Sequence, residues 1–185
     1  MLKKDNQTER IIIFIDGNNL YHIVKRMLPS KRQIEFNFRK FADYLTEGRK
    51  LIDVYYYTAP LDKSYDEEGY MKQQKFFDLL QRIPDFRLVL CRMQKKKSNN
   101  KIIYEAKEDD IHLAVDMVKL AYNDVYDIAI LVSSDGDFVP AVQAVKEKAK
   151  NVENIGFENK FSYHLQQTCD KFSKLKKTEV EKFFS

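Results

Sequence analysis

The sequence is poor in cysteine, glycine and proline and contains no tryptophan. Its two cysteines, Cys91 and Cys169, lie far apart and lack the spacing of a zinc site, which argues against a disulfide-built domain or a zinc finger. No apolar run approaches the roughly 20 residues of a membrane-spanning helix, and no signal peptide is visible. These absences predict a reduced, cytoplasmic protein that does not enter a membrane.

Size and charge narrow the possibilities further. A chain of 185 residues with 44% hydrophobic and 32% charged residues is typical of one soluble globular domain. The net charge of +4 is mildly basic, and lysines gather at 95–97 and 171–177. Taken alone, each lysine run is typical of a solvated surface. A basic chain with acidic residues at its strand ends, however, suits a polyanionic partner whose phosphates are bridged by metal.

Apolar runs and helical stripes alternate along the chain. Strands are expected over 11–15, 51–57, 86–92, 101–105, 126–132 and 152–156, and helices over 18–27, 36–46, 64–82, 109–123, 138–148, 162–168 and 178–184. The strand over 101–105 is expected to pair with the strand over 86–92 across a turn at 95–100. This alternation predicts a single α/β domain with a central, mostly parallel sheet and helices on both faces.

The ends of the chain and one helix carry more specific expectations. Residues 1–9 are expected to be disordered, residues 10–157 to form the domain, and residues 158–185 to add a helical extension to it. In the helix over 109–123, the apolar residues expected on one face, taken as the buried one, are Ile111, Ala114, Val115, Val118 and Tyr122.

Aspartates follow two of the expected buried strands. Asp16 comes directly after 11–15, and Asp135 and Asp137 follow 126–132 and a Ser-Ser pair. Open α/β sheets bind ligands at the carboxyl ends of their strands. Each loop is also compatible with simple helix capping, but a cap needs one carboxylate and the second loop offers two. Asp110, at a helix start on the flank of the expected buried face, and Asp116, within the same helix, are further candidates.

Three segments together resemble a known family. Phe14-Ile-Asp-Gly-Asn-Asn-Leu-Tyr21, Lys107-Glu-Asp-Asp-Ile-His-Leu-Ala-Val-Asp-Met117 and Ile130-Leu-Val-Ser-Ser-Asp-Gly-Asp-Phe-Val-Pro140 are similar to the opening, middle and closing motifs of NYN domains. The NYN domains that the chain resembles are in the LabA-like branch of the PIN-like nuclease superfamily. The resemblance implies a PIN-like fold, and it implies catalytic and metal-binding roles for Asp16, Asp110, Asp135 and Asp137, with Asn19 and Ser133 as supporting polar groups.

The expected function is therefore metal-dependent hydrolysis of phosphodiester bonds, with single-stranded RNA as the substrate that the resemblance implies. Clustered carboxylates favour Mg²⁺ or Mn²⁺. Candidate substrate contacts are Asn19, Ser133, a stacking Tyr21, Lys107, and the lysines of the expected turn, Lys95, Lys96 and Lys97. A homodimer is compatible with the sequence.

Two alternatives stay open at this stage. One is a non-catalytic RNA- or protein-binding regulator that keeps the fold, although a pure binder has little reason to concentrate negative charge beside phosphates. The other is a phosphatase of the HAD type, which needs a second aspartate where Asn18 follows Asp16. We rank the second alternative low.

Overall fold

In the part of the chain that the structure describes, the main sheet has six strands, all parallel, in the order β3-β2-β1-β6-β7-β8. The computed structural model of the chain describes residues 8–98 and 101–184, with the strands over 95–98 and 101–107 described by their backbone. The strands of this sheet are β1 (Arg10–Asp16), β2 (Lys50–Thr58), β3 (Phe86–Leu90), β6 (Ile128–Val132), β7 (Asn151–Phe157) and β8 (Lys171–Leu175). The prediction of a single α/β domain with a parallel sheet is confirmed.

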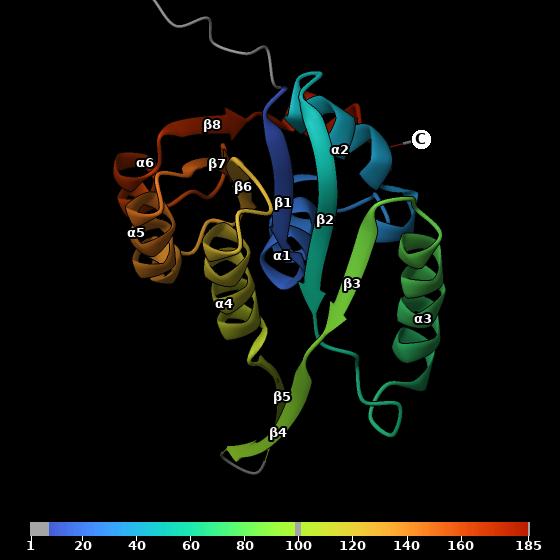
Figure 1. Cartoon of the computed structure of the whole chain (residues 1–185). Helices are drawn as coiled ribbons and strands as arrows, with labels where there is room; N and C mark the ends of the chain where they lie inside the picture. Colours follow the sequence, from blue (N-terminus) through green and yellow to red (C-terminus); the bar gives the residue numbers. More distant parts are fainter. Residues whose placement is uncertain (1–7, 99–100, 185) are drawn as a thin grey trace, which may run out of the picture.

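The helices cover both faces of the sheet (Figure 1). One layer contains α1 (Gly17–Met27), α2 (Phe38–Thr46), α3 (Glu67–Gln81) and α7 (Lys177–Glu181), and the other contains α4 (Asp109–Tyr122), α5 (Val139–Glu147) and α6 (Tyr163–Thr168). Short 3₁₀ turns, η1 (Gln33–Glu35) and η2 (Gly136–Phe138), precede α2 and α5.

Strand β1 shows why both faces need covering. Ile11, Ile13 and Ile15 pack into the core beneath α1 and α2, whereas Ile12 and Phe14 pack into the core beneath α4 and α5. All of these side chains are at most 1% exposed. A strand that is buried on both faces reads as a continuous apolar run, which is the pattern the sequence shows.

The strand order reverses between β1 and β6. From β1 the chain moves outward to β2 and β3, then crosses back through α4 to β6 on the other side of β1. At such a reversal the loops that leave the two strands diverge, and ligands of α/β proteins bind in the crevice between them. The residues that follow β1 and β6 therefore occupy the position in this fold best suited to a ligand site.

A two-stranded antiparallel hairpin projects from the sheet at the end of β3 (Figure 1). It consists of β4 (Arg92–Ser98) and β5 (Lys101–Lys107). The prediction of one strand over 86–92 paired with 101–105 was wrong, because the chain leaves the main sheet after Leu90 and β5 pairs with β4 instead. Lys95, Lys96 and Lys97 consequently lie in a paired strand and not in a turn.

The C-terminal segment is more than a helical extension. Helices α6 and α7 lie where helical pieces were expected, but β8 between them pairs in parallel with β7. Residues 158–184 thus complete one edge of the main sheet. The expected disorder of residues 1–9 falls mostly outside the described residues. Among the residues that the structure describes, no helix is both long and apolar enough to cross a membrane.

Helix α4 presents a different face to the sheet than expected. Leu113, Met117 and Ala121 are buried, whereas Ile111 and Val115 are 65% and 55% exposed. Continuing this buried stripe back by one helical turn reaches Asp109, which is also buried. This rotation decides which acidic side chain of the helix start enters the domain.

Candidate metal centre

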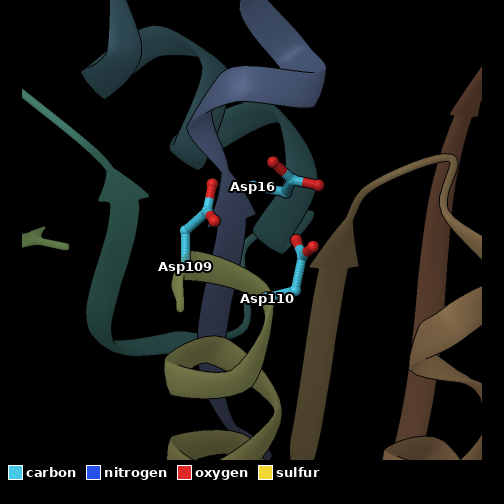
Figure 2. A group of neighbouring side chains, drawn as sticks. All are labelled: Asp16, Asp109 and Asp110. Atoms are coloured by element: carbon cyan, nitrogen blue, oxygen red, sulfur yellow. The ribbon is translucent and has the colours of Figure 1, made fainter. Parts of the chain in front are cut away.

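Three carboxylates meet beside the reversal point of the sheet. Asp16, at the end of β1, and Asp109 and Asp110, at the start of α4, each offer a carboxylate oxygen, and these oxygens lie within 4.8 Å of one another. Figure 2 shows the carboxylates of Asp109 and Asp110 directed towards Asp16. Two segments about 90 residues apart in the chain are joined here by the packing of α4 on β1 and β2.

Asp16 is buried and held in place by hydrogen bonds from the start of α1 and from the loop after β6. Its Oδ1 accepts the Asn19 backbone N–H at 2.9 Å, which caps α1, and its Oδ2 accepts the Ser133 hydroxyl at 2.9 Å. Asp16 is only 5% exposed. The next position, Gly17, has no room for a side chain, because a Cβ there would lie 2.6 Å from the Tyr57 carbonyl oxygen and would collide with the Tyr56 ring.

The two carboxylates of α4 have different surroundings. Asp109 is buried and accepts a hydrogen bond from the side-chain amide of Asn18 at 2.7 Å. Asp110 is exposed as a whole residue, but its carboxyl group lies at the cluster (Figure 2). The arrangement gives one deep, fixed carboxylate and one that faces the solvent side.

The loop after β6 is tied to the same site by a chain of hydrogen bonds. The Ser134 backbone N–H donates to the Asn19 side chain at 3.1 Å, and the Asp135 N–H donates to the Ser133 hydroxyl oxygen at 3.1 Å. The Asp137 N–H in turn donates to the Asp135 carboxylate at 3.0 Å. Ser133 therefore connects Asp16 to the loop that carries Asp135 and Asp137.

A buried amide in β7 supports this loop from below. The Asn154 side chain is fully buried, and its Nδ2 donates to the Leu131 and Ser133 carbonyls at 3.0 and 2.9 Å. These bonds satisfy carbonyls at the very end of β6, where the sheet ladder stops. They fix the backbone of Ser133 and hence the direction of its hydroxyl.

The crowding of negative charge is visible in the acid–base properties. Burial, together with the charges of Asp110 and Asp109, raises the pKa of Asp16 to about 7 against the hydrogen bonds from Asn19 and Ser133. Loss of solvent, followed by the charges of Asp109, Asp135 and Asp137, raises the pKa of Asp110 to about 6. Like charges this close are unfavourable unless a cation neutralises them.

The donor set fits a hard divalent cation. Three carboxylates within bridging distance are ligands that Mg²⁺ and Mn²⁺ prefer, and no sulfur or imidazole accompanies them in the group. Asp135 and Asp137 do not complete this group in the described chain. They lie on its rim, because the Asp135 N–H binds the same Ser133 hydroxyl that binds Asp16, and their charges act on Asp110. Asp16, Asp109 and Asp110 could therefore hold a divalent metal.

The remaining residues named from the sequence have different surroundings. Tyr21 is half-buried on α1, with its hydroxyl 3.2 Å from the Lys25 ammonium. Lys107 ends β5, and Lys95, Lys96 and Lys97 lie in β4; their side chains are outside the described part of the chain. The Asn19 side-chain oxygen accepts the Ser134 backbone N–H, so Asn19 joins the start of α1 to the loop after β6.

Asp116 belongs to the fold and not to the cluster. Its carboxylate accepts the Tyr57 hydroxyl at 3.0 Å, on the flank of α4 that faces β2. Burial and the Asp116 charge raise the pKa of Tyr57 far above its usual range, so the phenol remains a donor. The pair satisfies two polar groups at the edge of the α4 interface.

Replacement of Asp116 by asparagine is expected to leave metal binding and any metal-dependent activity within about threefold of the wild type, a difference of roughly 0.6 kcal/mol. The amide oxygen can still accept from Tyr57. Calorimetric titration with Mn²⁺ measures the effect, with Asp110→Asn as the matched change on the same helix. Loss of metal binding in Asp116→Asn but not in Asp110→Asn would reverse the assignment.

Asp109 is the acidic residue that the sequence interpretation missed. Acidic residues are common in the first turn of a helix because the helix dipole favours them, so Asp109 does not stand out by its position alone. The signal that identifies it is the spacing of Asp109, Leu113, Met117 and Ala121, an i, i+4 stripe that competes with the one through Ile111 and Val115.

Comparison with known proteins agrees with this architecture. The family model of the NYN domain matches residues 10–176. The chain belongs to the NYN domain family. The match includes β8, which supports treating this strand as part of the domain.

Individual relatives are more distant. The NYN chain is 25% identical over 166 residues to the Low amplitude and bright protein LabA of Synechococcus elongatus, covering 88% of this chain and 82% of that protein. It is 40% identical over 65 residues to the uncharacterized protein MJ0482 of Methanocaldococcus jannaschii, covering 35% of this chain but only 27% of that protein.

A solved structure shares the fold. The crystal structure of a protein of unknown function, VPA0982 from Vibrio parahaemolyticus, superposes with a TM-score of 0.71 at 22% identity, covering 93% of this chain and 96% of that one. At this identity the likeness supports the fold alone.

Proposed function

We propose that this NYN domain is a metal-dependent ribonuclease that hydrolyses phosphodiester bonds of single-stranded RNA. The observation that carries the proposal is the group formed by Asp16, Asp109 and Asp110 at the reversal point of a parallel sheet. Membership in the NYN family supports a nuclease over other uses of an acidic site. The choice of RNA, and of Mg²⁺ or Mn²⁺, follows from the family resemblance and the carboxylate ligands.

The roles of the side chains follow from their contacts. Asp16, Asp109 and Asp110 would hold the cation, with Asn18 and Ser133 fixing the orientation of the two buried carboxylates. A divalent cation held there would neutralise the charge of a bound phosphate and would lower the pKa of a water molecule. Asp135 and Asp137, on the rim beside Asp110, are the proposed further acidic groups of the site.

The β4–β5 hairpin gives the acidic site a basic neighbour. From Arg92 to Lys107 the sequence contains six Lys or Arg residues and one Glu, a net charge of +5, which exceeds the +4 of the whole chain. The hairpin follows the carboxyl end of β3, and α4 begins at this same end of the sheet (Figure 1). Polyanionic RNA would be attracted to the hairpin while its reactive phosphate lies at the carboxylates.

The test is cleavage of end-labelled single-stranded RNA. We expect fragments in the presence of Mn²⁺ or Mg²⁺ and none after a chelator is added. A sample of Asp110→Asn protein from the same purification controls for a contaminating nuclease. Cleavage that persists in this variant or in chelator would contradict the proposal.

The competing function, a non-catalytic binding module, makes a different prediction in the same experiment. It expects RNA to be retained by the protein, measured by gel shift, with no cleavage at any divalent ion concentration. The three carboxylates favour catalysis because they concentrate negative charge where a phosphate would otherwise be held.

Replacing Lys95, Lys96 and Lys97 together by alanine is expected to weaken RNA binding similarly for all sequences. Each lost phosphate contact on a single strand reduces the slope of log affinity against log salt by about 0.7, so the slope falls by up to about 2. Fluorescence anisotropy at several salt concentrations measures both quantities.

The matched control is the triple alanine variant of Lys174, Lys176 and Lys177. It removes the same charge beside β8, the edge strand on the other side of the sheet from β3. These residues lie at or just beyond the end of β8. If both triple variants lose the same affinity, the attraction is general and the hairpin has no special role. An unchanged affinity and slope in the hairpin variant shows that the hairpin does not contact RNA.

A further inference from the structure

The exposed face of α1 is basic and begins at the candidate metal centre. The first turn of the helix is tied to that centre through the side chains of Asn18 and Asn19. At about 100° per residue, the exposed residues His22, Lys25 and Arg26 continue along the same face. Helix α1 contains no acidic residue, so these side chains have no ionic partner on their own helix.

A fourth basic residue, Lys160, comes from the loop after β7. The Lys160 carbonyl accepts the Ser134 hydroxyl at 2.8 Å, so this loop lies directly against the loop that carries Asp135. On its other side the loop meets α1, where the Asn159 side-chain amide donates to the Ile23 carbonyl at 3.4 Å. The exposed Lys160 therefore lies beside both the basic face of α1 and the metal centre.

These four residues act together electrostatically. They form the α1 flank, which consists of His22, Lys25, Arg26 and Lys160. Burial lowers the pKa of the His22 imidazole, and the charges of the three other residues lower it further. The three positive charges are thus close enough to one side chain to act on it together.

The cations of the α1 flank form no ion pair in the part of the chain that the structure describes. Other exposed lysines of this protein do, as Lys171 pairs with Glu47 at 2.9 Å. Glu158, the acid of the β7 loop, accepts the Lys177 backbone N–H instead. Cations that repel one another without a neutralising acid create a positive field that attracts a polyanion.

The order of the strands puts the α1 flank on the other side of the metal centre from the β4–β5 hairpin. The hairpin follows β3 and Lys160 follows β7, whereas the centre lies between them, at the ends of β1 and β6. An RNA strand that crosses the centre from the hairpin would next reach the flank. Phosphates on both sides of the reactive one would then lie near cations.

We propose that the α1 flank binds the phosphodiester backbone of single-stranded RNA on the β7 side of the metal centre. This rests on the proposed function, because it assigns a path to that substrate. Lysine and arginine side chains bind phosphates without reading the bases, so the flank should bind RNA of any sequence.

Fluorescence anisotropy of a labelled oligouridylate, recorded in chelator so that the RNA stays intact, is the first test. The test variant combines Lys25→Ala, Arg26→Ala and Lys160→Ala. Its slope of log affinity against log salt should fall by up to about 2, at about 0.7 per phosphate contact. At about 0.1 M salt, this change corresponds to an affinity up to about 100-fold weaker.

The matched control replaces Lys50, Lys119 and Lys148 by alanine. These lysines are also exposed, but they lie at the opposite end of the sheet, where β2 begins and where α4 and α5 end. The control variant should bind RNA much like the wild type. Equal losses in the two variants would show a general attraction and overturn the α1 flank, as would a wild-type protein that does not bind the RNA.

Circular dichroism verifies folding, and Lys160→Glu, a single change on an exposed loop, takes the place of the triple variant if that protein does not fold. Failure of the flank and failure of the nuclease give different results. RNA that is bound through the flank but never cleaved in Mn²⁺ refutes the nuclease alone. Cleavage by the wild type, with unchanged affinity in the folded flank variant, refutes the flank alone.

The place of contact is tested by NMR of the histidine side chains. The chain has three histidines, and loss of one set of imidazole signals in His22→Gln assigns those of His22. RNA should shift the His22 signals over the same concentrations at which the anisotropy rises. RNA that binds without moving them contacts the protein elsewhere and overturns the proposal.

Discussion

Changing Asp16 to asparagine is expected to abolish RNA cleavage while leaving the fold intact. Asparagine still presents an oxygen to the Asn19 N–H, so the cap of α1 can persist, and its amide NH₂ can donate to the Ser133 hydroxyl oxygen in place of the bond that Asp16 accepts. The charge that a divalent cation requires is lost. Loss of a group that merely orients a metal ligand costs about 10–100-fold, so removal of the ligand charge should cost more than about 100-fold.

Initial cleavage rates in Mn²⁺, measured with calorimetric titration of Mn²⁺ into the protein, test this expectation. Asp78→Asn serves as the matched control, since Asp78 is an exposed carboxylate on α3, far from the cluster in the fold. Retention of both metal affinity and rate in Asp16→Asn would remove Asp16 from the site. Loss of rate with unchanged metal affinity would instead assign Asp16 a role towards the substrate.

The central strands were predictable because their residues have no other place to go. Ile11 to Ile15 and Ile128 to Val132 are apolar at every position, and only a strand covered on both faces buries such a run. The sharp turn after β1 was predictable for a similar reason, since Gly17 is followed by cap residues. From these strands the position of Asp16, and of the loop with Asp135 and Asp137, follows directly.

The edges of the fold were harder to predict because edge strands are not apolar throughout. β8 has the sequence Lys-Phe-Ser-Lys-Leu, in which lysines mark an exposed edge and only Leu175 is fully buried. Such lysines protect a sheet edge from pairing with other chains, and they also make the segment look like a charged surface run. The β4–β5 hairpin shares this character, which explains why its lysines were placed in a turn.

Helix α4 posed a different problem, because it has two apolar stripes. One stripe runs through Ile111, Val115 and Tyr122, and the other begins at Asp109 and continues through apolar residues. Periodicity alone cannot choose between them. The stripe that begins at Asp109 packs on the sheet. The charge of Asp109 is tolerated there because Asn18 donates a hydrogen bond to it and because it is the first residue of α4.

The acidic site lowers the stability of the metal-free fold through its two buried carboxylates. Asp16 and Asp109 are both buried at the carboxyl edge of β1, and burying carboxylates together opposes folding. Hydrogen bonds from Asn18, Asn19 and Ser133 offset part of this cost. What remains should appear as a dependence of stability on pH in the metal-free protein.

The metal-free protein is expected to become less stable as the pH rises from about 4 to 7. The pKa of Asp16 is 3.8 in its ordinary state and about 7 in the fold. Between these values the folded protein binds a proton at Asp16 that the unfolded chain has released. The stabilisation is thus complete below the unfolded pKa and is lost as the pH rises through the folded one.

The size of the effect follows from the shift in pKa. A rise from 3.8 to about 7 corresponds to roughly 4 kcal/mol, and Asp110 contributes in the same direction with a pKa of about 6. Exposure of Asp110 to solvent reduces its share. For a domain of this size each kcal/mol moves the melting temperature by about 2–4 °C.

Melting temperatures of wild-type and Asp16→Asn proteins, compared at each pH in the absence of metal, isolate this effect. His22, whose pKa is lowered by burial and by the charges of Arg26, Lys25 and Lys160, contributes with the opposite sign, and the comparison cancels it. Asp16→Asn should match the wild type near pH 4 and melt several degrees higher near pH 8. Mn²⁺ should raise the wild-type melting temperature at pH 8 and leave Asp16→Asn almost unchanged, because the variant lacks one of the three carboxylates that would hold the cation. Parallel melting curves for the two proteins across this range would mean that Asp16 is ionised in the fold without cost, and the carboxylates would then be too well solvated to need a cation.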